Sequence, residues 1–281
     1  MSRIAESSKN RTRLRRIDGR HNPLAKELRQ AFSRAELTDD GFCAIEGVRI
    51  VEEATRSGLR FRAVIFKESA ENLADRLLPQ IGANVDTLLF SDTLFDSVVP
   101  SETPQGVAAL VRWKEFSFED VLERLQIGPV VVLVGVQDPG NLGTILRSAE
   151  AFGCAGAVLG EGTVSAFNSK VIRASAGSIF RLPLVMAKAA GETDKISSKL
   201  RNAGVRLIAT SSHKGTPIDQ VRLTDSCAVF IGSEGSGLPR NLLSQVDELV
   251  AIPHTQQVES LNAGVAGSIV LYEAARQRRS G

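Results

Sequence analysis

The chain has 281 residues, of which 43% are hydrophobic and 23% charged, a composition typical of a globular protein with one or two domains. Its net charge of +2 excludes a uniformly basic surface, although residues 1–20 carry +5, residues 21–126 carry −6 and residues 127–281 carry +3. Three histidines and three widely separated cysteines predict no metal site and reduced thiols, which favours a cytoplasmic protein. No apolar run is long enough to span a membrane, so we expect no membrane partner.

The first part of the chain predicts an arm followed by a small domain. Residues 1–18 are polar, basic and aperiodic, which predicts a disordered arm that either only aids solubility or contacts phosphates. Residues 19–113 alternate between helical and strand patterns, which predicts a small α/β domain. We expect helices starting at residue 23 and over 47–57, 70–78 and 92–98, and strands over 42–45, 62–66, 85–89 and 107–111. Residues 114–128 predict a partly helical linker.

The remaining residues, 129–281, predict a second domain with a parallel sheet. The run 130–136 is apolar and rich in β-branched residues, as expected for a strand that is buried on both faces. Further strands are predicted over 155–159, 182–185, 205–210, 228–232 and 249–252, with helices between most of them. This alternation predicts a doubly wound sheet, in which ligands bind beyond the carboxyl ends of the strands.

The first of three segments that carry candidate chemistry is DPGNLGTILRSAEAFG, residues 138–153. It predicts a helix whose apolar face holds Leu142, Ile145, Leu146, Ala149 and Phe152. Arg147 points almost opposite that face, so it is not a core residue. Taken alone, Arg147 is either a solvated surface residue or a guanidinium that grips a phosphate.

The second segment, FIGSEGSGLP over residues 230–239, is a strand that runs into a glycine-rich loop. Its Glu234 repels phosphates and suits a cation or a hydroxyl, and no Gly-Lys-Ser/Thr follows to make a phosphate-binding loop. The third segment, IPHTQQVESLN over residues 252–262, predicts a polar loop with Ser260 as the N-cap of a helix that ends near Arg276. His254 is expected to be a loop residue, not a ligand or a base.

Taken together, the three segments resemble the SpoU (TrmH-like) branch of the SPOUT RNA 2′-O-ribose methyltransferases. The resemblance covers about residues 129–278 and rests on NLGTILRSAEAFG (141–153), IGSEGSGLP (231–239), and IP (252–253) with ESLN (259–262). The first domain, with FCAIEG (42–47) and SETPQG (101–106), resembles the L30e-like substrate-binding domain. The resemblance implies an α/β protein in which a trefoil-knotted parallel-sheet SPOUT domain follows a small L30e-like domain.

The resemblance also implies a cofactor, a partner and a reaction. S-adenosylmethionine is expected in the knot of a homodimer, held by Thr210, Gly232, Ile252 and Leu261. The reaction would methylate a ribose 2′-hydroxyl, with ribosomal RNA as the expected substrate. By position in the motifs, the expected catalytic residues are Asn141, Arg147, Glu234, Ser260 and Asn262.

Chemistry narrows some of these roles. A guanidinium is effectively never deprotonated, so Arg147 is expected to bind phosphate and stabilise the developing alkoxide, while the general base stays open. Asn141 would orient Arg147 or the ribose, and Glu234 would hold Arg147 or accept a hydrogen bond from the substrate. The loop HTQQV (254–258) departs from the Met-x-Gly-x-x pattern of many relatives, so contacts to the cofactor are expected to differ there.

Three other functions stay open at this point. A tRNA substrate is the nearest variant, although tRNA-acting relatives typically lack the L30e-like domain. A non-catalytic RNA-binding or ribosome-assembly protein would have lost part of the motif set, but here the whole set is present. A nucleotide-dependent α/β enzyme would bind phosphate at residues 232–237, which the missing lysine and the presence of Glu234 disfavour.

Overall fold

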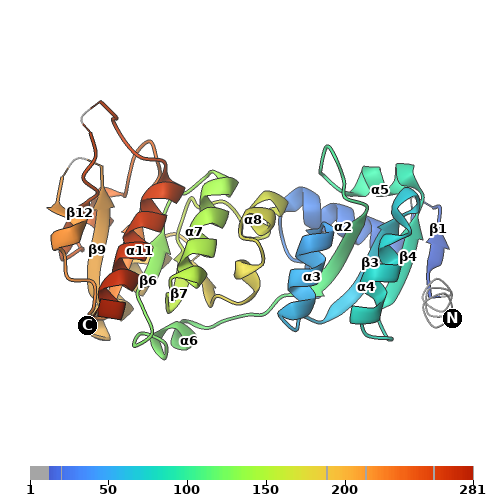
Figure 1. Ribbon diagram of the computed structural model, residues 1–281, viewed down its shortest axis with the longest axis horizontal. Coiled ribbons are helices and arrows are strands. Elements are labelled where there is room, and N and C mark those ends of the chain that lie inside the picture. Colours follow the sequence, from blue (N-terminus) through green and yellow to red (C-terminus); the bar gives the residue numbers. More distant parts are fainter. Residues whose placement is uncertain (1–12, 20, 188, 213, 256, 281) are drawn as a thin grey trace. The chain divides into compact units, whose positions relative to one another are not determined.

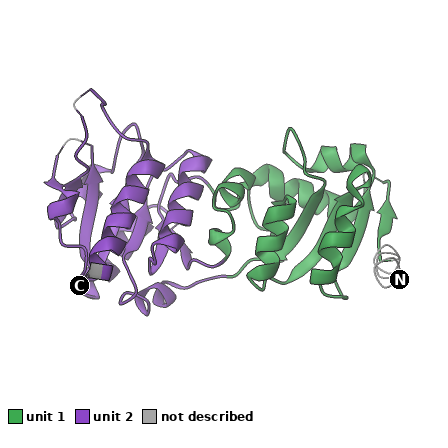
Figure 2. Cartoon of the chain, viewed as in Figure 1, with its two compact units in different colours: residues 1–114, 165–180 green, residues 115–164, 181–281 purple. Residues whose placement is uncertain are grey.

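The computed structural model describes residues 13–19, 21–187, 189–212, 214–255 and 257–280. The chain forms two compact units, coloured separately in Figure 2. Unit 1 contains the residues up to Lys114 together with 165–180, and unit 2 contains 115–164 and 181–281. Residues 165–180 therefore lie between the two parts of unit 2 in the sequence but fold as part of unit 1. The domain boundaries drawn from the sequence, with a linker over 114–128, stay predictions.

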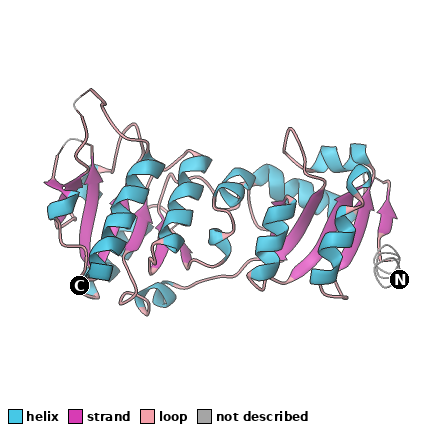
Figure 3. Cartoon of the chain, in the orientation of Figure 1, coloured by secondary structure: helices cyan, strands magenta, loops and turns pink. Residues whose placement is uncertain are grey.

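Unit 1 is built on a five-stranded sheet with helices packed against it (Figures 1 and 3). The strand order is β1-β4-β3-β5-β2, with β1 and β3 parallel to β4, and β5 antiparallel to both β3 and β2. The strands are β1 (Arg15–Ile17), β2 (Phe42–Glu46), β3 (Phe61–Lys67), β4 (Asp86–Phe90) and β5 (Val107–Arg112). The helices are α2 (Pro23–Arg34), α3 (Val48–Arg56), α4 (Leu73–Leu77), α5 (Asp92–Val98) and α8 (Ser169–Ala174). Apolar side chains of α2 and α5 form one buried core with strands of this sheet.

The prediction of a disordered arm over residues 1–18 is wrong for residues 15–17, which form strand β1. Strand β1 pairs in parallel with β4, which gives the otherwise unpaired edge of β4 a hydrogen-bonding neighbour. The hydroxyl of Thr87 adds a 2.6 Å hydrogen bond to the carbonyl of Arg13. The rest of the predicted arm, residues 1–12, lies outside the described residues.

Unit 2 is built on a seven-stranded sheet in which every described strand pairing is parallel, as predicted. The strand order is β10-β12-β9-β11-β6-β7-β8. The strands are β6 (Val130–Leu133), β7 (Gly156–Leu159), β8 (Leu184–Met186), β9 (Arg206–Ser211), β10 (Thr216–Pro217), β11 (Cys227–Ile231) and β12 (Glu248–Ala251). The helices are α6 (Phe118–Leu122), α7 (Pro139–Ala151), α9 (Glu192–Asn202), α10 (Arg240–Leu243) and α11 (Ala263–Ser280). The central strand β6 is buried along its whole length, as its β-branched run predicted, and so is its neighbour β11.

Four short 3₁₀ helices complete the described secondary structure, at Glu68–Ala70, Leu78–Gln80, Ser178–Phe180 and Ile218–Gln220. In the part of the chain described, no helix is long and apolar enough to cross a membrane. The same residues contain no group of three or more His, Cys, Asp or Glu side chains placed to hold a metal ion. The cysteines Cys43, Cys154 and Cys227 are all buried free thiols.

Helices α7 and α11 pack closely because α11 carries small residues. A Cβ atom on Gly267 would lie 3.0 Å from the side chain of Ile145 on α7, and one on Gly264 would lie 3.1 Å from Oδ1 of Asn141. The hydroxyls of Ser148 and Ser268 approach to 2.7 Å across the same contact. The small residues of α11 therefore allow it to pack closely on α7 of the same chain.

The predicted start of the last helix is wrong by two residues. Helix α11 begins at Ala263, and the side chain of Asn262 accepts a 3.1 Å hydrogen bond from the amide of Val265, so Asn262 is the N-cap. Ser260 is exposed and lies two residues before the cap. Serine and asparagine are both good N-caps. Asn262 takes this position because its side chain is also held by a hydrogen bond to Glu234.

Candidate functional site

The glycine-rich loop after β11 turns back tightly on itself. Ser233 and Gly237 exchange two backbone hydrogen bonds of 3.2 and 3.0 Å. A Cβ atom on Gly232 would lie 2.4 Å from the carbonyl carbon of Gly237, so no larger residue fits at 232. Gly237 has a φ of +65°, which favours glycine there as well. This geometry holds Glu234 at the tip of the loop, beyond the carboxyl end of the strand.

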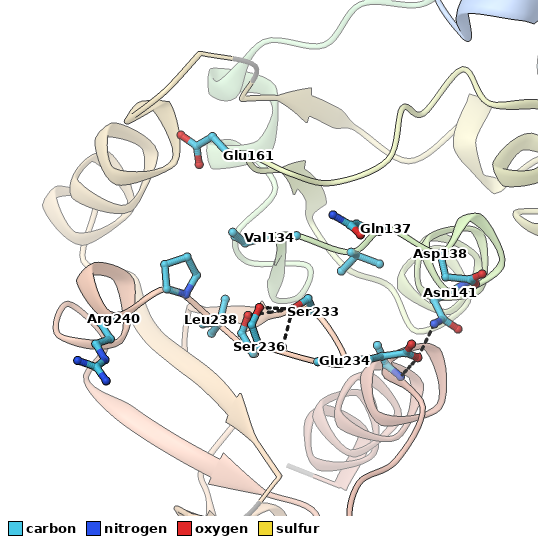
Figure 4. Close-up of a pocket in the computed structure, with 16 residues that line it drawn as sticks. Val134, Gln137, Asp138, Asn141, Glu161, Ser233, Glu234, Ser236, Leu238 and Arg240 are labelled. Carbon is cyan, nitrogen blue, oxygen red and sulfur yellow. Dashed lines mark hydrogen bonds between the residues drawn. The ribbon is translucent and has the colours of Figure 1, made fainter.

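One carboxylate oxygen of Glu234 brings the three motif segments together. Its Oε1 accepts hydrogen bonds from Asn141 Nδ2 at 2.6 Å, Asn262 Nδ2 at 2.9 Å and the backbone amide of Ala263 at 3.1 Å. Figure 4 labels Asn141 and Glu234 of this cluster. Asn141 lies at the start of α7, and Asn262 and Ala263 lie at the start of α11. The negative charge therefore sits at a helix N-terminus, where the helix dipole stabilises it. Its Oε2 makes no hydrogen bond to any residue that the structure describes.

A cavity of about 450 Å³, here called pocket A, lies at the carboxyl ends of β9, β11 and β12. All four residues predicted to bind the cofactor line it, namely Thr210, Gly232, Ile252 and Leu261. Ser260, Glu234 and His254 line it as well. The ring of His254 is fixed within its own loop, with Nδ1 2.7 Å from the carbonyl oxygen of Ile252.

A second cavity of about 610 Å³, here called pocket B, lies on the side of the loop that faces β6 and α7. It is lined by residues 134–138, Asn141, Glu161, residues 233–240 and Ala263 (Figure 4). Pockets A and B share residues 233–238 and Ala263. The loop that carries Glu234 is therefore a common wall of two cavities.

Arg147 stands apart from both pockets. It lies on the exposed face of α7, six positions after Asn141, which is about 9 Å along the helix axis. It lines neither cavity and forms no hydrogen bond or ion pair with a residue that the structure describes. Among the described residues of one chain, the expected pairing of Arg147 with Glu234 is not formed, and the donors to Glu234 are Asn141, Asn262 and Ala263.

Several residues of pocket B were not anticipated from the sequence. Asp138 is the N-cap of α7 and accepts a 2.7 Å hydrogen bond from the amide of Asn141, a role that its position before Pro139 signals. Glu161 accepts hydrogen bonds from the hydroxyl and amide of Thr193. Burial alone would raise the pKa of Glu161, but hydrogen bonds, chiefly from Thr193, outweigh it and lower that pKa. Gln137 and Arg240 carried no sequence signal of a site.

Comparison with known proteins identifies the family. Residues 128–272 match the model of the SpoU rRNA Methylase family, and residues 22–109 match the MRM3-like substrate binding domain. The chain belongs to the SpoU rRNA methylase family. It is 32% identical over 260 residues to the 23S rRNA (guanosine(2553)-2′-O)-methyltransferase RlmP of Bacillus subtilis, covering 92% of this chain and 98% of the relative.

Solved structures of this family share the fold. The SpoU methyltransferase AviRb from Streptomyces viridochromogenes, in complex with AdoMet, superposes with a TM-score of 0.80 at 27% identity, covering 93% of this chain and all of that one. An AdoMet-bound rRNA methyltransferase from Sinorhizobium meliloti gives 0.79 at 25% identity, covering 94% and 98%. The predicted family and the α/β fold with a parallel sheet and an N-terminal substrate-binding domain are confirmed. The trefoil knot stays a prediction.

Proposed function

We propose that this SpoU-family protein transfers the methyl group of S-adenosylmethionine to a ribose 2′-hydroxyl of ribosomal RNA. One observation carries the proposal: a pocket lined by the four expected cofactor residues meets a second pocket along the loop that holds Glu234. Family membership supports it, as do the 2′-O-methyltransferase name of the Bacillus relative and the AdoMet bound to two similar structures. We propose that the enzyme works in the cytoplasm, where its cysteines would stay reduced.

The residues around pocket A fit the proposed cofactor. The cavity of about 450 Å³ is within the range of small-molecule sites, and Ile252 and Leu261 offer apolar walls for a purine ring. Hydroxyl groups of Thr210 and Ser260 supply polar partners, and the backbone at Gly232 is free of side-chain bulk. When bound, S-adenosylmethionine supplies an electrophilic methyl group. The protein's part is to hold the acceptor hydroxyl in line with it.

Glu234 is the proposed positioning group for that hydroxyl. Three donors to Oε1 fix the carboxylate in one orientation, which leaves Oε2 to accept a hydrogen bond from the 2′-hydroxyl. Asn141 and Asn262 would act through Glu234, since their amide groups are already bound to it. Preorganisation of this kind avoids rearranging polar groups during the reaction.

We propose that the protein is a homodimer formed through α11. Val265, Ile269 and Tyr272 recur at helical spacing on one face of α11 and are exposed by 48%, 36% and 48%. An exposed apolar stripe on a helix is typical of a protein interface. We propose that this stripe packs against the same stripe of a second copy of the chain. Because α11 packs on α7, this interface would bring Arg147 of one chain toward the site of its partner, where it would bind phosphate.

Sedimentation tests the dimer. We expect the wild type to sediment as a dimer, and Ile269→Glu to sediment as a monomer because it places a charge in the apolar interface. Ile127→Glu is the matched control, since Ile127 is also exposed but lies outside α11. A dimeric Ile269→Glu variant would contradict this interface.

Calorimetry and methyl transfer test the function. We expect the purified protein to bind S-adenosylmethionine and to transfer its tritiated methyl group to ribosomal RNA. Ala266→Leu adds bulk to the wall of pocket A and should weaken cofactor binding at least about tenfold, while Ala275→Leu, on the same helix but outside the pocket, should not. Failure of the wild type to bind the cofactor would refute the proposal.

Mapping of 2′-O-methyl groups in total RNA decides between ribosomal and transfer RNA. RNA from cells with and without the gene should differ at a ribosomal position. A difference confined to tRNA would replace the proposed substrate with the nearest alternative.

A further inference from the structure

We propose that pocket B receives the target nucleotide, with Gln137 hydrogen-bonding the edge of its base and Arg240 contacting its phosphate. This inference rests on the proposed methyl transfer and specifies where the acceptor sits. Pocket B lies on the other side of the loop from pocket A, the proposed cofactor pocket. Away from the shared loop, the two pockets are lined by different residues.

The shared wall gives the first argument. Methyl transfer needs the acceptor oxygen about 3–3.5 Å from the methyl carbon, so the two substrates must meet at one place. Pockets A and B meet only where they share residues 233–238 and Ala263, and Glu234 is part of that shared wall. With the cofactor in pocket A, an acceptor in pocket B would reach the methyl group at Glu234. Asn141, which fixes Glu234, lines pocket B and not pocket A.

The size and walls of pocket B suit a nucleotide. Its volume of about 610 Å³ exceeds that of pocket A and falls within the range of ligand sites. Val134 and Leu238 present apolar surface to the cavity (Figure 4). Apolar surfaces of this kind can cover the face of a base that has been turned out of an RNA strand.

Gln137 provides an amide that can read a base edge. Its side chain is exposed, extends toward the cavity in Figure 4, and makes no hydrogen bond to a residue that the structure describes. The backbone on both sides of it is fixed, because Val136 accepts a 3.0 Å hydrogen bond from the amide of Val164 and Asp138 caps α7. A side-chain amide donates and accepts at once, so it can make paired hydrogen bonds to a base.

Charge places the phosphate at one end of the pocket. Arg240 and Asn141 lie at opposite ends of the cavity in Figure 4. Arg240 makes no ion pair with a described residue, so its guanidinium is available to a phosphate. Asp138 lies at the Asn141 end of the view in Figure 4, where its carboxylate repels a phosphate. The other lining carboxylate, Glu161, already accepts hydrogen bonds from Thr193. The phosphate is therefore expected at the Arg240 end.

Steady-state kinetics test the base contact. The probe is ribosomal RNA from cells in which the gene is deleted, with tritiated methyl transfer as the readout and calorimetry for S-adenosylmethionine. Gln137→Ala and Gln137→Glu should each lower kcat/KM for this RNA at least about tenfold, because a lost bidentate base contact has an effect of that order. Both variants should bind the cofactor as the wild type does. Gln126→Ala, an exposed glutamine outside both pockets, should match the wild type in both measurements.

Salt dependence tests the phosphate contact. Arg240→Gln should reduce the slope of log binding constant against log salt by about 1, as expected for one lost phosphate contact, while Lys195→Gln on α9 should leave it unchanged. Gln137 variants that keep kcat/KM within about twofold would overturn the inference. So would Gln137 variants that lose cofactor affinity, since the cofactor would then occupy pocket B. A wild type that binds no S-adenosylmethionine would instead refute the proposed function itself.

Discussion

The side-chain amide of Asn141 donates a 2.6 Å hydrogen bond to Oε1 of Glu234, a residue 93 positions further along the chain. Asn262 donates to the same oxygen from 28 positions beyond Glu234. The three motif segments are therefore parts of one hydrogen-bonded cluster, in which a single carboxylate joins the loop to the starts of α7 and α11. This explains why a glutamate stands in the glycine-rich loop.

Replacing Glu234 should strongly reduce the rate of methyl transfer. Glu234→Ala removes the acceptor of three donors, and we expect a loss of about 10²–10³ in kcat, the usual effect of losing one preorganised polar group. Glu234→Gln keeps one oxygen but not the charge, so its hydrogen bonds weaken and its loss should be intermediate. Tritium transfer at saturating S-adenosylmethionine measures both variants.

Glu123→Gln is the matched control for these variants. Glu123 is exposed in unit 2 and lines neither pocket, so its replacement should leave transfer unchanged. If Glu234→Ala retains wild-type kcat, the carboxylate has no part in positioning the hydroxyl.

A mixture of two inactive variants should regain activity if Arg147 serves the site of the partner chain. Arg147→Ala and Glu234→Ala each lack one group, but a heterodimer of the two contains one complete site when the groups come from different chains. Random exchange makes half of the dimers mixed, so activity should reach about a quarter of the wild-type value per chain. The measurement is tritium transfer after the two variants are unfolded and refolded together, with each variant refolded alone as the control.

No recovery in that mixture would place Arg147 in the site of its own chain. Arg147→Ala should in either case bind S-adenosylmethionine normally, because Arg147 lines neither pocket. Arg147→Lys should restore little activity, since an ammonium group cannot reproduce the planar fork of a guanidinium.

Periodicity predicted the parts of the fold that depend on burial alone. Five residues were predicted as one apolar face of a helix: Leu142, Ile145, Leu146, Ala149 and Phe152. The first four are fully buried on α7, whereas Phe152 is half-buried at its C-cap. The parallel sheet followed from the alternation of predicted strands and helices. The partners of Glu234 could not be predicted, because which of several polar side chains reaches a carboxylate depends on how distant segments fold together. The N-cap of α11 moved from Ser260 to Asn262 for the same reason.

Residues 165–180 show a second limit of sequence patterns. They were predicted to belong to the second domain, because they lie between two of its predicted strands, whereas the structure places them and helix α8 in unit 1. A polar contact joins the segment to unit 1, beside the ring contact of Phe167 with Trp113. Arg173 of α8 donates to Glu46 at 3.1 Å and to Ser101 at 3.0 Å, and the Ser101 hydroxyl donates to Glu46 at 2.5 Å. Glu46 and Ser101 belong to the two motifs that resembled the L30e-like domain.

Removing Arg173 should therefore destabilise unit 1. Glu46 is only 3% exposed, and loss of its cation leaves a buried charge without its partner. Because the Arg173 side chain is 37% exposed, we expect a loss of about 2 kcal/mol, less than for a fully buried pair. Urea unfolding of the full chain measures the loss for Arg173→Ala. Lys170→Ala, on the exposed side of the same helix, should lose less than about 0.5 kcal/mol.

A double-mutant cycle separates the contact from a general effect on α8. Glu46→Gln should lower the cost of Arg173→Ala, because the partner left behind is then neutral. Equal costs of Arg173→Ala in both backgrounds would show that the ion pair does not hold this segment.

Acid should weaken the contact between Glu161 and α9. Burial raises the pKa of Glu161, but hydrogen bonds, chiefly from Thr193, outweigh it, so the folded-state pKa lies below the ordinary value of 4.5. A depressed carboxylate pKa contributes stability that is present above the unfolded pKa and is lost as pH falls through the folded pKa. Glu161→Gln should therefore be less stable than the wild type at pH 7, and this difference should shrink as the pH falls below about 4.5. Urea unfolding at a series of pH values measures it, with Glu123→Gln as the control. A difference that does not change with pH would show that the Glu161 charge contributes nothing to the stability of this contact.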